Sequence, residues 1–217
     1  MSVVAIVPAY NEEDRIAATI VAIKTIESID RILVVNDGST DRTVEIARAA
    51  GVEVLEMPGN VGKGQALTNA AKTINDDIVL FLDADLGATA SEAAKLLPPV
   101  LNGEADLTIA QFPPPKKKGG FGFVKGLAAW GIGREGMKSC EPLSGQRAMT
   151  LKLLQDVLPF RSGFGIEIGM TIRALRKGYR ILEIPVEMTH AETGRDIKGF
   201  IHRGRQFLDV FKVILTE

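Results

Sequence analysis

Short apolar runs alternate with amphipathic stretches through the first half of the chain. The apolar runs predict strands at residues 2–7, 31–35, 52–55, 79–82 and 106–110. Between them, apolar residues recur at helical spacing, as Ile16, Ile20 and Ile23 do, which is typical of a helix with one buried face. This strand–helix rhythm predicts an α/β fold with a doubly wound, mostly parallel sheet and helices on both faces.

Polar residues indicate where two of these helices begin. Asn11 is a favoured N-cap residue, and the acidic residues at 12–14 would form the first helical turn after it. The pattern Thr89-x-x-Glu92 predicts a capping box at the start of a later helix, which would end near Pro98. Both helices are therefore expected to follow directly on a loop at a strand end.

The fourth apolar run carries the strongest chemical signal. Residues 78–82 are all apolar, which predicts a strand buried on both faces. Asp83 and Asp85 follow at its carboxyl end, where open α/β sheets bind their ligands. Two hard oxygen donors at that place suit a divalent cation that bridges to phosphates. An ordinary turn is the alternative, because Asp is also a favoured turn residue.

Polar loops follow the earlier strands in the same way. Residues 10–12 and 36–39 come after the first two strands, so we expect them to lie with Asp83 and Asp85 at one edge of the sheet. Residues 57–64 form a glycine-rich loop, with Lys63 close to the start of the next helix. Such a loop lets backbone N–H groups approach an anion. Its glycine spacing differs from that of a Walker A loop.

The chain changes character after residue 112. Residues 113–120 run from prolines through lysines to glycines, which predicts an exposed, mobile loop. This loop is either a simple connector or a lid whose lysines attract an anionic acceptor or a membrane surface. Residues 121–138 predict a helix interrupted by glycine, and residues 142–148 lead into a short helix.

Charge also divides the chain at this point. Residues 1–112 hold 8 Lys and Arg against 17 Asp and Glu, whereas residues 113–217 hold 18 against 10. An acidic half that holds a metal and a basic half that faces an anion would explain this difference. Solvated helix faces of unlike charge explain it equally well. We expect residues 1–112 and residues 113–217 to be two halves of one domain.

Two polar residues of the second half are candidates for chemistry. Glu167 lies among glycines and apolar residues at 163–169, where a partly buried carboxylate serves as a base or a sugar anchor. A helix N-terminal Glu that faces backbone amides is the alternative. His190 follows a strand expected at 179–186 and would reach a metal at Asp85, although a lone His is more often structural.

The end of the chain predicts an amphipathic helix at about 198–216. Its apolar residues are Ile201, Phe207, Leu208, Phe211, Ile214 and Leu215. We expect this face to pack on the sheet domain, with a membrane surface or a partner subunit, such as a second copy in a homodimer, as the alternatives.

Composition limits the cellular setting. Cys140 is the one cysteine, so no internal disulfide forms and a reducing compartment is expected. The chain has neither a signal peptide nor an apolar run approaching the roughly 20 residues of a spanning helix. We therefore expect a cytoplasmic protein, with peripheral contact at the inner face of the membrane as the alternative. Only 6% of residues are aromatic, which argues against nucleic-acid binding.

The order of the motifs resembles a known family. Pro8-Ala9-Tyr10-Asn11-Glu12-Glu13, Asn36-Asp37-Gly38-Ser39-Thr40-Asp41, Gly62-Lys63-Gly64, the DXD motif Asp83-Ala84-Asp85 and Leu143-Ser144-Gly145 together resemble the family 2 type of nucleotide-sugar glycosyltransferase with the GT-A fold. The second half is similar to the glucosyl-3-phosphoglycerate synthases in residues 62–67, 142–145 and 163–169 and in His190.

This resemblance implies a metal-dependent hexosyltransferase that uses a UDP- or GDP-sugar. It makes residues 1–112 the nucleotide-sugar-binding half and residues 113–217 the acceptor-binding half of one domain. It assigns to the nucleotide sugar Pro8, Ala9, Tyr10, Glu12, Asn36, Asp37, Lys63, Asp83, Ala84 and Gly145. Asp83 would contact the ribose, while Asp85 and His190 would hold Mg²⁺ or Mn²⁺ against the diphosphate. Glu167, beside the donor sugar, and Asp85 are the expected catalytic residues. The basic second half, rather than the resemblance, favours an anionic acceptor that is phosphoglycerate-like or a polyprenyl phosphate. This acceptor would meet Lys116, Arg134 and Arg195, and its identity stays open because the chain is shorter than many phosphoglycerate-specific relatives.

Several points stay open at this level. Asn36 stands where many family members have an acidic residue, so the nucleotide base is undecided. Glu167 fits either the base of an inverting enzyme or a sugar contact in a retaining one. A sugar-phosphate nucleotidyltransferase would have a similar sheet, but residues 8–11 replace the glycine-rich, Arg-containing loop such enzymes carry. A non-catalytic nucleotide-sugar-binding protein is the remaining alternative.

Overall fold

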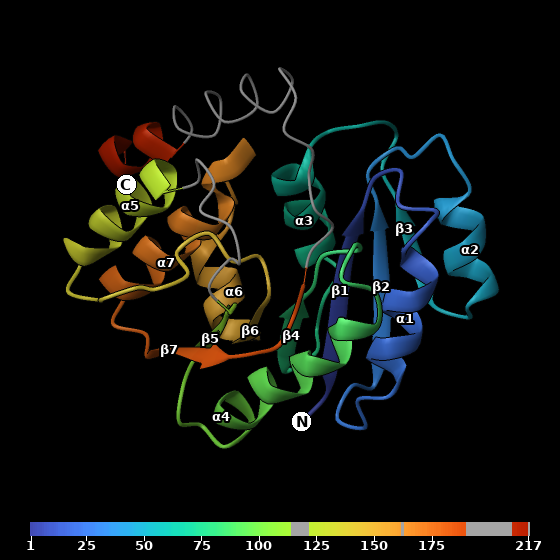
Figure 1. Cartoon of the computed structure of the whole chain (residues 1–217), viewed down its shortest axis with the longest axis horizontal. Coiled ribbons are helices and arrows are strands. Elements are labelled where there is room, and N and C mark those ends of the chain that lie inside the picture. Colours follow the sequence, from blue (N-terminus) through green and yellow to red (C-terminus); the bar gives the residue numbers. More distant parts are fainter. Residues whose placement is uncertain (114–121, 162, 190–209, 217) are drawn as a thin grey trace.

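A single sheet connects the parts of the chain that the structure describes, which are residues 1–113, 122–161, 163–189 and 210–216 of a computed structural model (Figure 1). Its strands are β1 (Val3–Ala9), β2 (Arg31–Asn36), β3 (Glu53–Glu56), β4 (Ile78–Phe81), β5 (Leu107–Gln111), β6 (Arg147–Thr150) and β7 (Ile181–Pro185). They lie in the order β3-β2-β1-β4-β6-β5-β7. β6 runs antiparallel to both of its neighbours, and the other pairings are parallel. The predicted mostly parallel α/β sheet is therefore confirmed.

Helices cover both faces of this sheet because its central strands are apolar on both sides. On β1, Val3, Ala5 and Val7 belong to one core cluster, whereas Val4 and Ile6 belong to the other. The first cluster lies under α1 (Ile16–Lys24), α2 (Thr43–Ala49), the 3₁₀ helix η1 (Gly87–Leu96) and α4 (Leu97–Leu101). The second lies under α3 (Lys63–Ala71), α6 (Leu151–Val157) and α7 (Ile166–Arg176), with the 3₁₀ turn η2 (Gly163–Gly165) directly before α7.

A third apolar cluster lies outside α7. It joins α7 to α5 (Gly122–Gly133) and to residues 210–216, which are helical. In that last segment Val210, Val213 and Ile214 are buried, while Phe211 is 43% and Leu215 is 67% exposed. The prediction that the end of the chain packs on the domain holds for these residues, but the predicted apolar face was wrong at Phe211 and Leu215. Residues 198–209 lie outside the described part of the chain.

Strand β6 was not predicted. Its four residues, Arg147 to Thr150, begin with a charged side chain and lack an apolar run long enough to indicate a strand. Pairing on both sides forms it, because Phe81 of β4 and Ile109 of β5 both stand opposite Arg147. The short helix expected after this segment is present as α6.

Asn11 does not cap the first helix. Its backbone is left-handed, with φ of 56°, and its side-chain Oδ1 accepts a hydrogen bond from the Thr40 N–H at 2.8 Å. Residues 12–15 form a turn in which the Glu12 carbonyl accepts from the N–H groups of Arg15 and Ile16. The polar segment is used to join the first two strand-end loops, and the helix begins only where the apolar residues start.

The predicted capping box at Thr89 and Glu92 is also absent. The Thr89 hydroxyl donates to the Leu86 carbonyl at 2.7 Å, and Glu92 accepts from the Glu187 N–H. The segment is a 3₁₀ helix, and Pro98 lies at the beginning of α4 rather than at the end of a helix. Proline is well tolerated there because the first helical N–H groups have no partner within the helix.

Gly64 offers a test of how α3 packs against the backbone at Arg161. A Cβ built on Gly64, in the first turn of α3, would lie 2.1 Å from the Arg161 carbonyl oxygen. Alanine normally stabilises a helix by about 1 kcal/mol relative to glycine, but here the clash dominates. We expect Gly64→Ala to lower the free energy of unfolding by about 1–3 kcal/mol, as overpacked cores do, measured by chemical denaturation.

Gly126 on α5 is the matched control, because it is exposed and its Cβ would meet no atom within 4 Å. Gly126→Ala should leave stability unchanged or raise it. An unfolding free energy of Gly64→Ala equal to or above that of the parent protein would contradict the packing of α3 on residue 161.

Candidate active site

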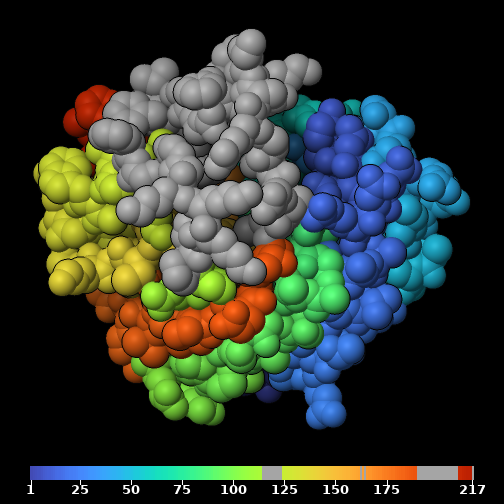
Figure 2. All heavy atoms as spheres, viewed as in Figure 1, coloured from blue at the N-terminus to red at the C-terminus, as the bar shows by residue number. Residues whose placement is uncertain are grey.

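The carboxyl ends of β1, β2 and β4 border a cleft of about 390 Å³. The arrowheads of these strands point to the same edge of the sheet in Figure 1. The cleft is lined by Pro8, Ala9, Tyr10, Glu12, Asp37, Asn60, Gly62, Lys63, Asp83, Ala84 and Asp85. The structure thus brings together most of the residues that the sequence assigned to the nucleotide sugar, and it adds Asn60 and Gly62. In Figure 2 the first residues of the chain, coloured blue to cyan, lie together on the right of the view.

Asp37 holds the glycine-rich loop in place. It is only 5% exposed, and its two oxygens accept hydrogen bonds from the Val61 and Gly62 N–H groups at 2.8 and 2.9 Å. The neighbouring Gly38 has a φ of +76°, and a Cβ there would lie 2.6 Å from the Asn60 nitrogen. The loop and the turn after β2 therefore touch through their backbones.

Asn36 lies beneath the cleft and does not line it. It is 3% exposed, and its Oδ1 accepts from the Ser39 N–H at 3.0 Å. This bond closes the turn that presents Asp37. The assignment of Asn36 to the nucleotide sugar therefore stays a prediction.

Lys63 connects the two halves of the chain. Its Nζ lies 2.8 Å from Asp83 Oδ1 and 3.2 Å from Glu167 Oε1. Burial alone would lower the pKa of Lys63, but the two carboxylates outweigh burial and raise that pKa. The ammonium group therefore stays charged and compensates both acids.

Gly145 and Gln146 complete this side of the site. A Cβ on Gly145 would lie 3.0 Å from both Asp83 Oδ2 and Lys63 Nζ, so glycine lets the chain pass close to the ion pair. The fully buried Gln146 donates through Nε2 to Asp83 Oδ2 at 2.7 Å. Sequence reasoning missed Gln146, because nothing in its local sequence shows that it reaches a residue 63 positions away.

The other side of the cleft is crowded with carboxylates. Burial raises the pKa of Glu12, and the negative charges of Asp85 and Asp83 raise it further. No group of three or more His, Cys, Asp and Glu side chains that would by itself hold a metal occurs in the described ranges. Asp85 lines the cleft, whereas His190, its predicted partner, lies outside those ranges.

Of the three predicted acceptor residues, the structure describes Arg134, which does not line the cleft. Arg134 follows α5, and its guanidinium lies 5.4 Å from the centroid of the Trp130 ring. Lys116, with nearly all of the predicted loop at 113–120, and Arg195 lie outside the described residues. Their role stays a prediction.

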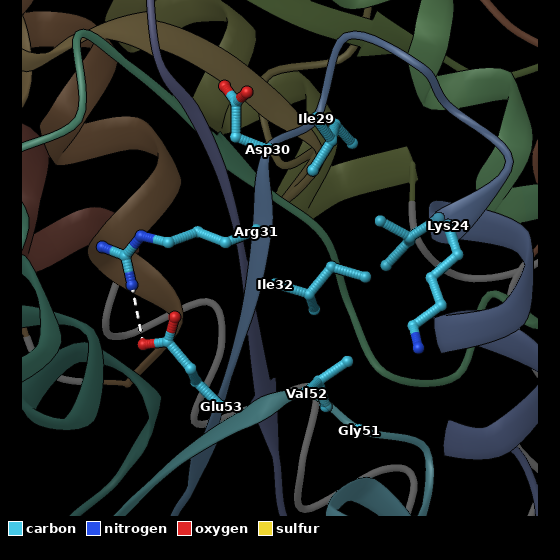
Figure 3. Close-up of a pocket in the computed structure, with 9 residues that line it drawn as sticks. Lys24, Ile29, Asp30, Arg31, Ile32, Gly51, Val52 and Glu53 are labelled. Atoms are coloured by element: carbon cyan, nitrogen blue, oxygen red, sulfur yellow. Dashed lines mark hydrogen bonds and ion pairs between the residues drawn. The ribbon is translucent and has the colours of Figure 1, made fainter.

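A second depression lies at the opposite edge of the sheet, beside the start of β2 (Figure 3). It encloses about 240 Å³. Its charged groups are already bonded: Arg31 to Glu53 and Asp76, Lys24 to the Ala50 carbonyl, and Asp30 to the Val3 N–H. The carboxyl-edge cleft is therefore the better candidate for an active site.

Comparison with known proteins supports this choice. The family model for glycosyl transferase family 2 matches residues 4–164, which include the whole cleft. The chain belongs to this family. Family membership favours glycosyl transfer over the nucleotidyltransferase alternative.

Two relatives resemble much of the chain. Glycosyltransferase AglJ of Haloferax volcanii is 32% identical over 195 residues, covering 87% of this chain and 63% of the relative. Glucosyl-3-phosphoglycerate synthase of Mycolicibacterium smegmatis is 32% identical over 188 residues, covering 77% of this chain and 62% of the relative. The chain thus spans a little over 60% of the length of these two curated relatives.

Solved structures show the same architecture. Glucosyl-3-phosphoglycerate synthase from Mycobacterium tuberculosis, in complex with Mn²⁺, UDP-glucose and phosphoglyceric acid, superposes with a TM-score of 0.81 at 27% identity, covering 98% of this chain and 79% of that one. The same enzyme with Mg²⁺ and UDP gives a TM-score of 0.83 and covers 99% of this chain. The GT-A-like fold is thereby confirmed. Within the described residues, no helix is long and apolar enough to cross a membrane.

Crowding of the carboxylates predicts a stability effect. Because folding raises the pKa of Glu12, its negative charge destabilises the folded protein above that raised pKa and has no such effect below the unfolded value of about 4.5. Glu12→Gln should therefore raise the melting temperature at pH 7.5 in the presence of a chelator. The gain should shrink toward zero as the pH is lowered to about 4.

Glu13→Gln is the control, because the Glu13 carboxylate pairs with Arg42 and its loss should not stabilise the protein. Thermal unfolding of the parent and both variants across this pH range measures the difference. A melting temperature of Glu12→Gln at or below that of the parent at pH 7.5 would show that Glu12 is not under electrostatic strain.

Proposed function

We propose that this chain is a Mg²⁺- or Mn²⁺-dependent hexosyltransferase that moves a sugar from a nucleotide diphosphate to an anionic acceptor. The observation that carries the proposal is the cleft after β1, β2 and β4, where Asp83 and Asp85 face the glycine-rich loop in a member of glycosyl transferase family 2. The M. tuberculosis relative binds Mn²⁺ with UDP-glucose, or Mg²⁺ with UDP, in the same fold.

The charge balance of the cleft supports a cation. Among the described residues, Glu12, Asp37, Asp83 and Asp85 line it together with one cationic side chain, Lys63, and Lys63 is already paired with Asp83. A diphosphate would be repelled from such a site unless positive charge came with it. The available donors fit, since Mg²⁺ in nucleotide sites commonly takes one or two carboxylates and leaves other positions to phosphates. Asp85 would hold the ion, with His190 as the proposed second ligand.

The donor would lie along the cleft. Pro8, Ala9 and Tyr10 form the wall at the carboxyl end of β1, where the nucleoside would bind. Asp83 would accept a hydrogen bond from the ribose, while Lys63 and Gln146 hold its carboxylate in place. The close approach of Gly145 to Lys63 and Asp83 leaves the backbone at that point available to the donor sugar.

The bound cation and Glu167 would have separate roles in the transfer of the sugar. When bound, the cation offsets the negative charge that grows on the leaving diphosphate. The Glu167 side chain is 12% exposed and lies 3.2 Å from Lys63, which lines the cleft, although Glu167 itself does not line it. It would either take the proton of the acceptor hydroxyl as that oxygen attacks the anomeric carbon and the diphosphate leaves, with inversion, or bind the donor sugar in a retaining transfer. The anomeric configuration of the product distinguishes these roles.

The acceptor belongs to the second half in this proposal. Residues 113–217 carry an excess of 8 positive charges, and the mycobacterial relative binds phosphoglyceric acid. We therefore propose a phosphate-bearing acceptor, either a small phosphorylated acid or a polyprenyl phosphate. A screen of UDP- and GDP-sugars against both acceptor classes, with identification of the product, tests this.

Asp85 gives the sharpest test of the metal assignment. Asp85→Ala should lower nucleoside diphosphate release by about 100-fold or more, because loss of a group that stabilises developing charge typically costs that much. The folded state should survive, since Asp85 lies in a partly exposed loop. Release is measured with Mg²⁺ or Mn²⁺ titrated at saturating donor.

Asp30→Ala is the control, because this carboxylate accepts from the Val3 N–H at the opposite edge of the sheet. Its release rate should stay within about twofold of the parent, as expected for a substitution outside the site. An Asp85→Ala variant with the parent's rate and metal dependence would refute the assignment of the cation to Asp85.

A further inference from the structure

Arg147 is the largest of the fully buried side chains in the described residues. It begins β6, between Phe81 of β4 and Ile109 of β5. A charged side chain at the centre of a sheet is costly to desolvate and needs a specific reason to be there. Arg147 does not line the cleft, so direct contact with a ligand there does not explain its position.

Its hydrogen bonds join two segments that carry proposed site residues. Nε donates to the Ser144 carbonyl at 2.7 Å, and one terminal nitrogen lies 3.4 Å from the Pro142 carbonyl. The other terminal nitrogen donates to the Thr171 hydroxyl on α7 at 2.8 Å. The ion pairs found among the described residues do not include Arg147. One guanidinium thus bridges a loop and a helix through neutral acceptors.

The loop end of this bridge leads directly to the ion pair. Ser144 is followed by Gly145, whose backbone passes beside Lys63 and Asp83, and by Gln146, which donates to Asp83. The start of the same loop is fixed separately, since Glu183 of β7 accepts from the N–H groups of Cys140 and Glu141. Arg147 therefore sets the position of the part of the loop that faces the cleft.

The helix end leads to Glu167. Thr171 lies one turn after Glu167 on α7, and its hydroxyl donates to the Glu167 carbonyl at 2.9 Å. A shift of Thr171 would therefore move the first turn of α7. Burial lowers the pKa of Arg147 to about 10, with Glu167 and Glu183 opposing that shift, so the guanidinium keeps its full set of donors at neutral pH.

We propose that Arg147 is a positioning residue that fixes the Gly145–Gln146 segment relative to Glu167, and that it thereby aligns the donor sugar with the group that acts on the acceptor. A purely structural filler would need only volume, which methionine supplies. The arrangement of three donors toward two carbonyls and one hydroxyl matches the planar fork of arginine, which lysine lacks. The inference rests on the proposed transferase function.

The first test compares turnover in single and double variants. Arg147→Met should lower kcat by about 10- to 100-fold, the cost of misplacing a reacting group by about 1 Å, while the KM for the donor changes by less than about threefold. If Arg147 acts through Glu167, then Arg147→Met in a Glu167→Gln background should cost little more than Glu167→Gln alone. An equal fold-loss in both backgrounds would overturn the proposal.

Thr171→Val removes the hydroxyl that accepts from Arg147 and keeps the shape of the side chain. It therefore tests the link between Arg147 and Glu167 even if Arg147→Met fails to fold. It should also lower kcat without a matching rise in donor KM. Thr108→Val is the control, because its buried hydroxyl donates to the Leu96 carbonyl on the other face of the sheet. Turnover by Thr171→Val equal to that of Thr108→Val would count against the link.

Hydrogen exchange separates this inference from the proposed function. Arg147→Met or Thr171→Val should speed backbone exchange in residues 142–146 and in the first turns of α7, and leave β1 and β2 unchanged. If the parent protein releases no nucleotide with any donor, the proposed function fails. Hydrogen exchange then still tests whether Arg147 couples residues 142–146 to the first turns of α7. Unchanged exchange in residues 142–146 would overturn the positioning role of Arg147.

Discussion

The bridge from Asp83 through Lys63 to Glu167 is the interaction on which the site depends. Asp83 follows a strand of the first half, and Lys63 begins a helix beside the glycine-rich loop. Glu167 lies in the first turn of a helix of the second half. Without the ammonium group, two acids would face each other in a partly buried place, which is unfavourable. One lysine therefore makes it possible for two distant acidic segments to meet and form a single site.

The cleft is built at some expense to stability. Glu12, Asp83 and Asp85 lie close enough for their charges to raise the pKa of Glu12, whereas a protein selected for stability alone would separate them. Conflicts of this kind are typical of functional sites, where residues are arranged for a ligand rather than for the empty fold. The crowding that weakens the folded state is also the feature that would attract the proposed cation.

The sequence was informative where a local pattern decides the structure. Apolar runs predicted β1, β2, β4 and β5, and the loops after three of these strands meet as expected. The sequence was uninformative where contacts between residues far apart in the chain decide the structure. β6 is held by neighbours on both sides, and Gln146 is meaningful only beside Asp83. Asn11 misled because a good helix cap is equally good at bonding another loop.

The place of β6 in the sheet has a consequence for how the chain assembles. β5 lies between β6 and β7, both of which come later in the sequence, and it has no pairing with β4. During synthesis β1 to β4 can pair as they emerge, but β5 must wait with open edges until β6 arrives. Pairings of this long range are slow and expose strand edges to aggregation. We therefore expect synthesis of the segment between β5 and β6 to limit how soon the sheet can be completed.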